Sequence, residues 1–134
     1  MFLQPKKTKF KKTQKGRLKL LDFRANNLRF GTFGLKAESS GVVTARQLEA
    51  ARRVITRKMK RKGKIWTCVF PNIPVTAKPI ESRMGKGKGI VSHWVAKVRG
   101  GTLLFEICGI TSHTAFEALR SGGKKLPVRT KIFD

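Results

Sequence analysis

The residue types best suited to binding chemistry come together in one short segment, SRMGKGKG, which spans residues 82–89. From Gly85 onward every second residue is glycine, so the backbone carries little side-chain bulk and can adopt positive φ angles. Arg83, Lys86 and Lys88 place cations along it. Such a loop can bring peptide N–H groups against a sugar–phosphate backbone while its cations neutralise the phosphates. It is not a nucleotide-binding P-loop, because glycine follows each lysine where GxxxxGK[ST] requires Ser or Thr. The alternative is a hairpin tip that contacts nothing.

Side chains that usually carry catalysis or bind metals are sparse and scattered. His93 and His113 are the only histidines, and they lack the HExxH spacing of zinc proteases. Cys68 and Cys108 form no CxxC motif and lie in apolar segments, where cysteine behaves as a small hydrophobe. The acidic residues form no paired-carboxylate motif. The sequence therefore predicts no catalytic site, no metal site and no cofactor.

The clearest helix is expected from Thr44 to Lys62. Thr44 and Gln47 have capping-box spacing, and Gly63 occupies the position of a C-terminal cap. A helical wheel gives an apolar stripe of Leu48, Ala51, Ile55 and Met59 opposite a basic stripe of Arg46, Arg53, Arg57 and Lys60. Because Glu49 is the only acid in this segment, we expect the helix to forgo i,i+4 ion pairs. The basic stripe then faces either a nucleic acid, which we favour, or solvent alone.

Residues 1–27 are predicted to form an extended basic arm, since they contain a single acid and show neither a helical nor a strand period. Bound to RNA, each of its cations could displace condensed counterions. The candidate phosphate-binding residues are Lys6, Lys7, Lys9, Lys11, Lys12, Lys15 and Arg17. A solvated tail or a nuclear-import-like basic run is the alternative.

The overall charge balance points to a polyanionic partner. The 134 residues contain 31 Lys and Arg against 7 Asp and Glu, a formal net charge of +24. Even screened by physiological salt, the mutual repulsion of this charge amounts to several kcal/mol, against a typical domain stability of ~5–15 kcal/mol. A hydrophobic content of 40% argues against complete disorder. No apolar run approaches the ~18–20 residues of a membrane span.

The remaining pattern predicts a single α+β domain over residues 28–134. A strand or loop-strand is expected over residues 28–37, a turn at 38–41, and a central strand over 64–70, which is apolar on both faces. Residues 75–78 can form at most a short edge strand between prolines. A strand at 92–99 is expected to pair with 102–110 as a hairpin through Gly100-Gly101. A second helix should begin at Ser112, with Ala115, Phe116 and Leu119 facing the core, and a last strand should follow Pro127.

Six strings, spread in order along the chain, resemble ribosomal protein sixteen of the bacterial-type large subunit: LQPKKTKFKK, FGTFGLKA, TARQLEAARR, GKIWTCVFPNIPVTAKP, RMGKGKG and KLPVRTKIF. The resemblance implies a two-layer α+β sandwich with a hammerhead-like strand arrangement, in which two helices pack on a mixed or antiparallel sheet. In this chain Gly122-Gly123 stands where the family usually has helix-forming residues, which leaves the length of the second helix open.

The resemblance also implies a function without enzymatic activity. Family members bind large-subunit rRNA, help to shape the aminoacyl site and lie close to bound tRNA near the peptidyl transferase centre. The matching loop residues nearest tRNA would be Arg83, Met84, Gly85, Lys86, Gly87, Lys88 and Gly89. The expected partners are rRNA, tRNA and neighbouring ribosomal proteins, with no membrane and no second copy of the chain.

The expected location is a ribosome. A start that matches the family's own start, without a presequence, fits a bacterial cytoplasm or a protein encoded in an organelle. The Lys- and Phe-rich composition without tyrosine favours a mitochondrion. A free-standing basic nucleic-acid chaperone and an RNA-acting enzyme are the rival classes; the first would not sediment with large subunits, and the second would show turnover.

Overall fold

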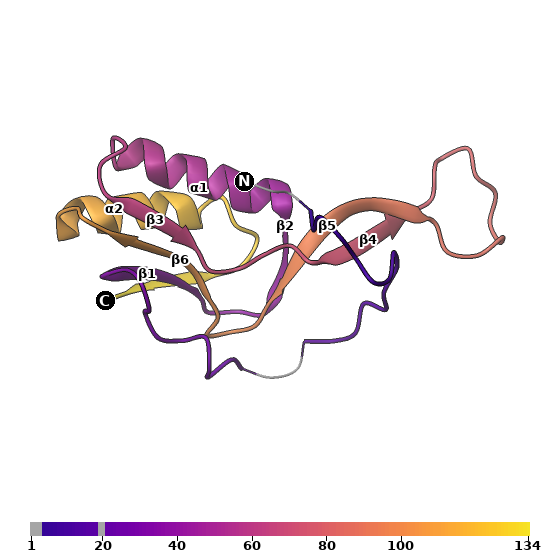
Figure 1. Cartoon of the computed structure of the whole chain (residues 1–134), viewed down its shortest axis with the longest axis horizontal. Coiled ribbons are helices and arrows are strands. Elements are labelled where there is room, and N and C mark those ends of the chain that lie inside the picture. The colour runs from indigo at the N-terminus through magenta and orange to yellow at the C-terminus, as the bar shows by residue number, and fades with distance from the viewer. Residues whose placement is uncertain (1–3, 19–20) are drawn as a thin grey trace.

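A computed structural model describes residues 4–18 and 21–134. Within them the order is β1 (Phe33–Ala37), β2 (Gly41–Thr44), α1 (Ala45–Lys58), β3 (Lys64–Thr67), β4 (Ile73–Ala77), β5 (Ile90–Val98), β6 (Leu103–Cys108), α2 (Ser112–Gly123) and β7 (Thr130–Phe133). The strands form a four-stranded sheet, β3-β6-β1-β7, and a three-stranded sheet, β2-β5-β4, and every pairing is antiparallel. The predicted α+β class is confirmed (Figure 1).

The main core lies between the four-stranded sheet and the two helices, which cover one of its faces (Figure 1). Phe105 and Ile107 on β6 and Leu35 on β1 pack there with Ile55 of α1 and Leu119 of α2, and all of these side chains are fully buried. Residues 21–32 run along the other face of this sheet. This arrangement leaves the outer side of α1 free to carry charge.

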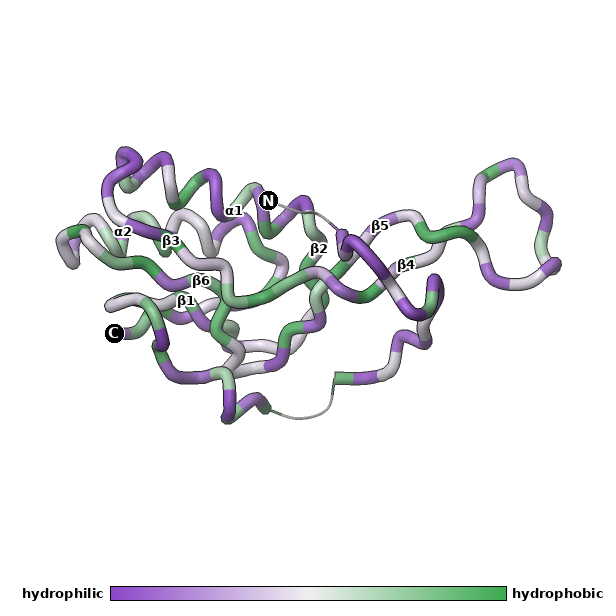
Figure 2. Tube along the Cα trace, viewed as in Figure 1, coloured by the Kyte–Doolittle hydropathy of each residue, from purple (hydrophilic) through white to green (hydrophobic). Residues whose placement is uncertain are grey.

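The three-stranded sheet carries a long projection. The first half of β5 pairs with β4, and the loop of residues 78–89 lies at the far tip of this hairpin (Figure 1). Hydrophilic residues dominate the arm, the loop and the outer side of α1, as Figure 2 shows. Strand β4 lies at the edge of its sheet, which confirms the edge strand predicted before the loop. It begins earlier than predicted, at Ile73, and includes Pro74.

Helix α1 begins as its sequence predicts. Thr44 accepts a hydrogen bond from the Gln47 N–H, and the Gln47 side chain accepts one from the Thr44 N–H, which completes a capping box. The predicted apolar stripe of Leu48, Ala51, Ile55 and Met59 is buried.

The predicted end of this helix at Lys62 is wrong, because α1 ends at Lys58 and Met59 is its C-cap. The N–H of Lys60 donates to the carbonyl of Arg57, and the N–H of Arg61 donates to that of Thr56. These two bonds form a Schellman motif, which usually has glycine at the position of Lys60. Here Lys60 and Arg61 adopt φ angles of 52° and 62°. The helix therefore ends in a local turn at Lys60, before Gly63 is reached.

Two strand predictions are corrected by the topology. Strand β3 is not central but lies at the edge of its sheet and spans only Lys64–Thr67. The prediction that β5 and β6 form a hairpin is also wrong, since the two strands belong to different sheets. Gly100-Gly101 instead forms a corner between the sheets, where Gly101 donates to the Ala37 carbonyl and Ala37 donates to that of Thr102.

Helix α2 begins at Ser112 as expected and continues through both glycines to Gly123. A Cβ at Gly122 would lie 2.5 Å from Cγ1 of Ile55, so the missing side chain lets α2 approach α1 closely. Ala115 and Leu119 are buried as predicted, but Phe116 is not, and it is 42% exposed. Its ring meets Phe33 edge-on at the margin of the core, and Ala118 takes the buried position instead.

Candidate nucleic-acid interface

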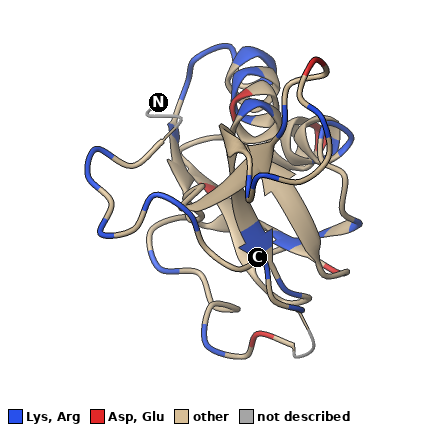
Figure 3. Ribbon diagram, turned by 90° about the vertical axis from the view of Figure 1, so that its right-hand side faces the viewer, with Lys and Arg blue, Asp and Glu red and all other residues tan. Residues whose placement is uncertain are grey.

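Three basic segments form the candidate interface: the outer side of α1, the arm over residues 4–18, and the loop over residues 78–89. Figure 3 shows Lys and Arg along all three. Every predicted phosphate-binding residue of the arm is exposed, as are Arg46, Arg53 and Arg57 on α1 and Lys60 in the turn that follows it. The structure therefore leaves all of these cations accessible to a polyanion.

The α1 face contains an ion-pair cluster that the sequence interpretation missed. Glu49 binds Arg52 through two hydrogen bonds of 2.7 and 2.8 Å and Arg53 through one of 3.0 Å. Hydrogen bonding from Arg52, against the opposing effect of burial and with further help from Arg53, lowers the pKa of Glu49 to about 2. The expectation that this helix forgoes ion pairs is thus wrong, because one acid serves two arginines at i+3 and i+4.

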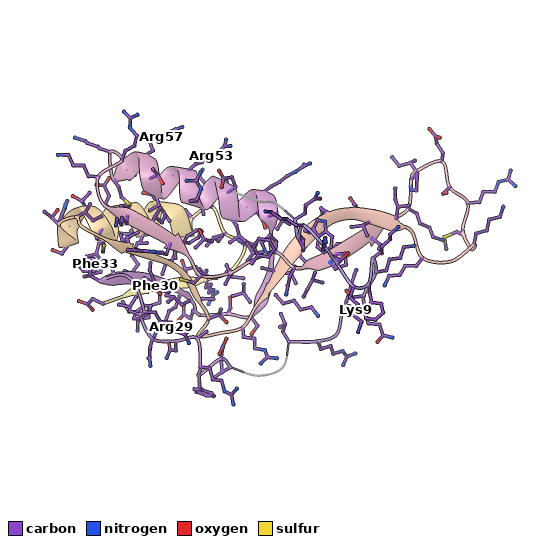
Figure 4. The ribbon with its side chains drawn as sticks, in the orientation of Figure 1. Lys9, Arg29, Phe30, Phe33, Arg53 and Arg57 are labelled. Atoms are coloured by element: carbon purple, nitrogen blue, oxygen red, sulfur yellow. The ribbon has the colours of Figure 1, made fainter. Side chains whose placement is uncertain are left out.

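Arg57 lies further along the same face. An open groove of about 530 Å³ runs between Arg52, Arg53, Thr56, Arg57, Lys60 and Arg61. Figure 4 shows the side chains of Arg53 and Arg57 pointing outward from α1. A groove lined by guanidinium and ammonium groups suits phosphate oxygens, which accept bidentate hydrogen bonds from arginine.

The fold brings the arm and the loop together, although they are far apart in the sequence. Lys12 Nζ donates to the Lys88 carbonyl at 2.8 Å, and Lys88 Nζ donates to the Thr13 carbonyl at 2.6 Å. The ammonium group of each lysine thus binds a backbone carbonyl of the other segment.

The tip of the loop has the backbone that its glycines permit. Gly85, Lys86 and Gly87 adopt φ angles of 91°, 52° and 82°, and residues 83–88 are exposed. Lys78 donates to the Gly85 carbonyl across the loop. Met84 is 97% exposed and Ile80 is completely exposed, so the tip presents apolar side chains as well as cations.

Arg46 links α1 to the arm. It lines a pocket of about 430 Å³ with Gln4 of the arm and with His93 and Trp94 of β5. The basic face of α1 and the loop, in contrast, lie at different ends of the molecule, and the arm runs between them (Figure 1).

Four of the seven acids are bound within the protein. Besides Glu49, Glu117 pairs with Lys58 at 2.6 Å. Asp22 accepts hydrogen bonds from the N–H groups of Arg24 and Ala25 and from the Thr102 hydroxyl. Glu106, the fourth, is 1% exposed. Each of these acids is therefore bound by groups of the same chain, although Glu117 itself remains exposed.

Glu106 is the main site residue that the sequence interpretation passed over. Its Oε2 accepts hydrogen bonds from three consecutive N–H groups, those of Arg29, Phe30 and Gly31, at 3.2, 2.7 and 2.7 Å. Burial alone would raise its pKa, but these bonds together with one from the Cys68 thiol outweigh burial and lower it. A lone acid in the apolar string LLFEIC was the available signal, since such an acid needs partners.

The described residues contain no cluster of three or more His, Cys, Asp or Glu side chains that could hold a metal ion. Desolvation, and after it the nearby Glu106 carboxylate, raises the pKa of Cys68 to about 12, so this thiol is a poor nucleophile at neutral pH. No helix in residues 4–18 and 21–134 is long and apolar enough to cross a membrane.

Comparison with known proteins decides the family. The family model described as ribosomal protein L16p/L10e matches residues 5–133. The chain belongs to this family. The resemblance found from the six strings is therefore confirmed.

Individual relatives of the family are similar over almost the whole chain. Proteins named large ribosomal subunit protein uL16 from Mesorhizobium japonicum and Christiangramia forsetii are each 57% identical over 130 residues, which is 97% of this chain and 95% and 94% of theirs. The protein of that name from Cereibacter sphaeroides is 58% identical over 130 residues, 97% of this chain and 95% of its own. These relatives are bacterial and give no support to the mitochondrial preference drawn from composition.

Proposed function

We propose that this chain is a structural constituent of the large ribosomal subunit and binds large-subunit rRNA. The observation that carries the proposal is the separation of charge on the folded chain. Glu106 is buried, Glu49 and Asp22 are partly buried, and the exposed Glu117 is paired with Lys58. In contrast, Arg46, Arg53 and Arg57 of α1 and the cations of the arm and the loop are exposed. The names of the relatives, each a large-subunit protein, support the same assignment.

In this proposal the three basic segments have distinct roles. Arg46, Arg53 and Arg57 of α1, with Lys60 in the turn that follows it, bind phosphates. The arm, from Lys6 to Arg17, threads between rRNA helices. The loop from Arg83 to Gly89, at the tip of a hairpin that projects from the body, reaches tRNA in the aminoacyl site near the peptidyl transferase centre. The protein then positions RNA and leaves the chemistry to it.

The test of the α1 role is the salt dependence of binding to a large-subunit rRNA fragment. Arg57→Ala should reduce the slope of log K against log salt by about one, the effect of one lost phosphate contact. Arg53→Ala should reduce it by less, because Glu49 already neutralises part of the Arg53 charge at 3.0 Å. Arg120→Ala, which removes an exposed charge from α2, is the matched control and should leave the slope unchanged.

A binding constant that stays the same from ~50 to ~200 mM salt would contradict the electrostatic contact. Sedimentation separates the proposal from a free-standing nucleic-acid chaperone, since a ribosomal constituent should move with intact large subunits. Crosslinking from a photoreactive group at Arg83 in a translating particle should reach tRNA or adjoining rRNA.

A further inference from the structure

An aromatic pocket lies apart from the three basic segments. Phe30 and Trp66 stack with ring centroids 6.1 Å apart and planes at 22°, within the range of offset aromatic pairs. Both rings line a pocket of about 240 Å³ together with Arg29, Asn27 and Thr67. Phe30 is nevertheless 64% exposed, so only part of its ring is covered. Figure 4 shows Arg29 and Phe30 side by side at the lower side of the sheet.

The backbone that carries Arg29 and Phe30 is held rigidly. Their N–H groups and that of Gly31 all donate to Oε2 of the buried Glu106. Trp66 lies directly opposite Glu106 in the β3–β6 pairing. The backbone that carries the cation and both rings is therefore held in place before any ligand arrives, which lowers the entropy cost of binding.

The chemistry of the pocket fits one planar, uncharged or weakly polar group next to an anion. Its volume lies below the ~300–1,000 Å³ of sites for drug-sized ligands, so it has room for a base rather than a whole nucleotide. Aromatic rings and arginine planes stack on unpaired RNA bases, and Asn and Thr side chains can hydrogen-bond base edges. Arg29 can at the same time bind the adjoining phosphate.

We propose that the pocket of Phe30, Trp66 and Arg29 binds a single unstacked base of RNA. The proposal rests on the rRNA binding proposed above and extends it, because the basic segments recognise phosphates whereas this pocket recognises a base. The base stacks on the exposed part of Phe30, since rings 6.1 Å apart leave no space for insertion between them. The site thus fixes the position of one nucleotide beside the sheet.

Trp66 fluorescence in the full-length chain tests the proposal. The chain has 2 tryptophans, so Trp94→Phe leaves Trp66 as the only emitter. Hexa-adenylate should quench this emission, whereas inorganic polyphosphate, which has charge without bases, should bind without quenching it. Phe30→Ala should abolish the quenching and weaken hexa-adenylate binding about tenfold, as expected for one lost stack, with polyphosphate affinity unchanged.

Two further variants separate stacking from folding and from apolar contact. Phe30→Leu keeps apolar area but lacks an aromatic face, so it should behave like Phe30→Ala. Phe30→Trp, measured by affinity, should retain hexa-adenylate binding. If both ligands bind, and neither the quenching nor the effect of Phe30→Ala is seen, the base pocket is refuted while the phosphate contacts stand. If neither ligand binds at any salt concentration, both proposals fail.

Discussion

At the scale of single residues, backbone N–H groups take the place of hydration water around the buried carboxylate of Glu106. Three of these groups converge on Oε2, and the Cys68 thiol lies 3.4 Å from Oε1. A buried charge without such donors would be strongly destabilising. The same bonds attach residues 29–31 to β6, so one side chain both satisfies its own charge and positions Arg29 and Phe30.

Glu106→Gln should lower the free energy of unfolding by about 2–3 kcal/mol at neutral pH, because charge-assisted hydrogen bonds become neutral ones. The folded-state pKa of Glu106 lies below its ordinary value of 4.5. Its contribution is therefore present above pH ~4.5 and is lost as pH falls through the folded pKa. Urea denaturation from pH 7 to pH 3 should show the difference between the variant and the native chain narrowing towards acid.

Glu38→Gln is the matched control, since Glu38 is exposed. It should change stability little at any pH. If the Glu106→Gln protein were as stable as the native one at pH 7, the hydrogen bonds from the three N–H groups would not need a charged acceptor to stabilise the fold, and the prediction would be wrong.

At the scale of elements, the end of α1 combines backbone strain with positive charge. Lys60 occupies the glycine position of a Schellman motif at a φ of 52°. A side chain there costs roughly 1–2 kcal/mol of strain. Lys60 is also one of the cations that line the α1 groove. We infer that strain is tolerated at this turn because the charge is used there, in keeping with strained residues at functional sites.

Lys60→Gly should accordingly raise the free energy of unfolding by about 0.5–1 kcal/mol, since relief of strain exceeds the entropy cost of glycine. It should also weaken rRNA binding through the lost charge. Lys62→Gly removes the same charge at a residue with no positive φ and should give no such gain. Thermal unfolding of the two variants compares them directly, and equal melting temperatures would argue against strain at Lys60.

At the scale of the whole molecule, the net charge of +24 opposes folding. This value already counts all 7 acids, so their contacts within the chain do not reduce it further. Because salt screens repulsion between exposed charges, the isolated chain should become more stable as salt rises. A fold stabilised by surface ion pairs would instead become less stable as salt rises, because salt also screens attraction.

Raising sodium chloride from ~50 to ~500 mM should therefore raise Tm. Chloride is preferable to sulfate, which also strengthens apolar burial. The variant Arg46→Gln with Arg57→Gln should show a smaller increase, because two exposed charges are gone. Replacing Thr8 and Thr13 by Gln leaves the charge unchanged and is the control. A Tm that falls with added salt would show that attraction outweighs repulsion.

The local pattern predicted those features that depend on near neighbours. The Thr44–Gln47 capping box, the apolar stripe of α1 and the start of α2 at Ser112 all follow from residues within a few positions of one another. The basic segments and the glycine-rich loop could likewise be located, because charge and backbone freedom are properties of the residues themselves.

What the sequence determined by itself was thus the class of fold, the family and the positive surface. Tertiary structure alone decided the rest: that β5 and β6 part at Gly100-Gly101 into different sheets, that β3 lies at an edge, and that Phe116 stays exposed. It also decided that Glu106 meets the N–H groups of residues 29–31, more than seventy positions away. The physical reason is that these outcomes depend on which residues, distant in the sequence, pack against each other. Hydrophobic burial is non-directional, so the local pattern of apolar residues does not specify their partners.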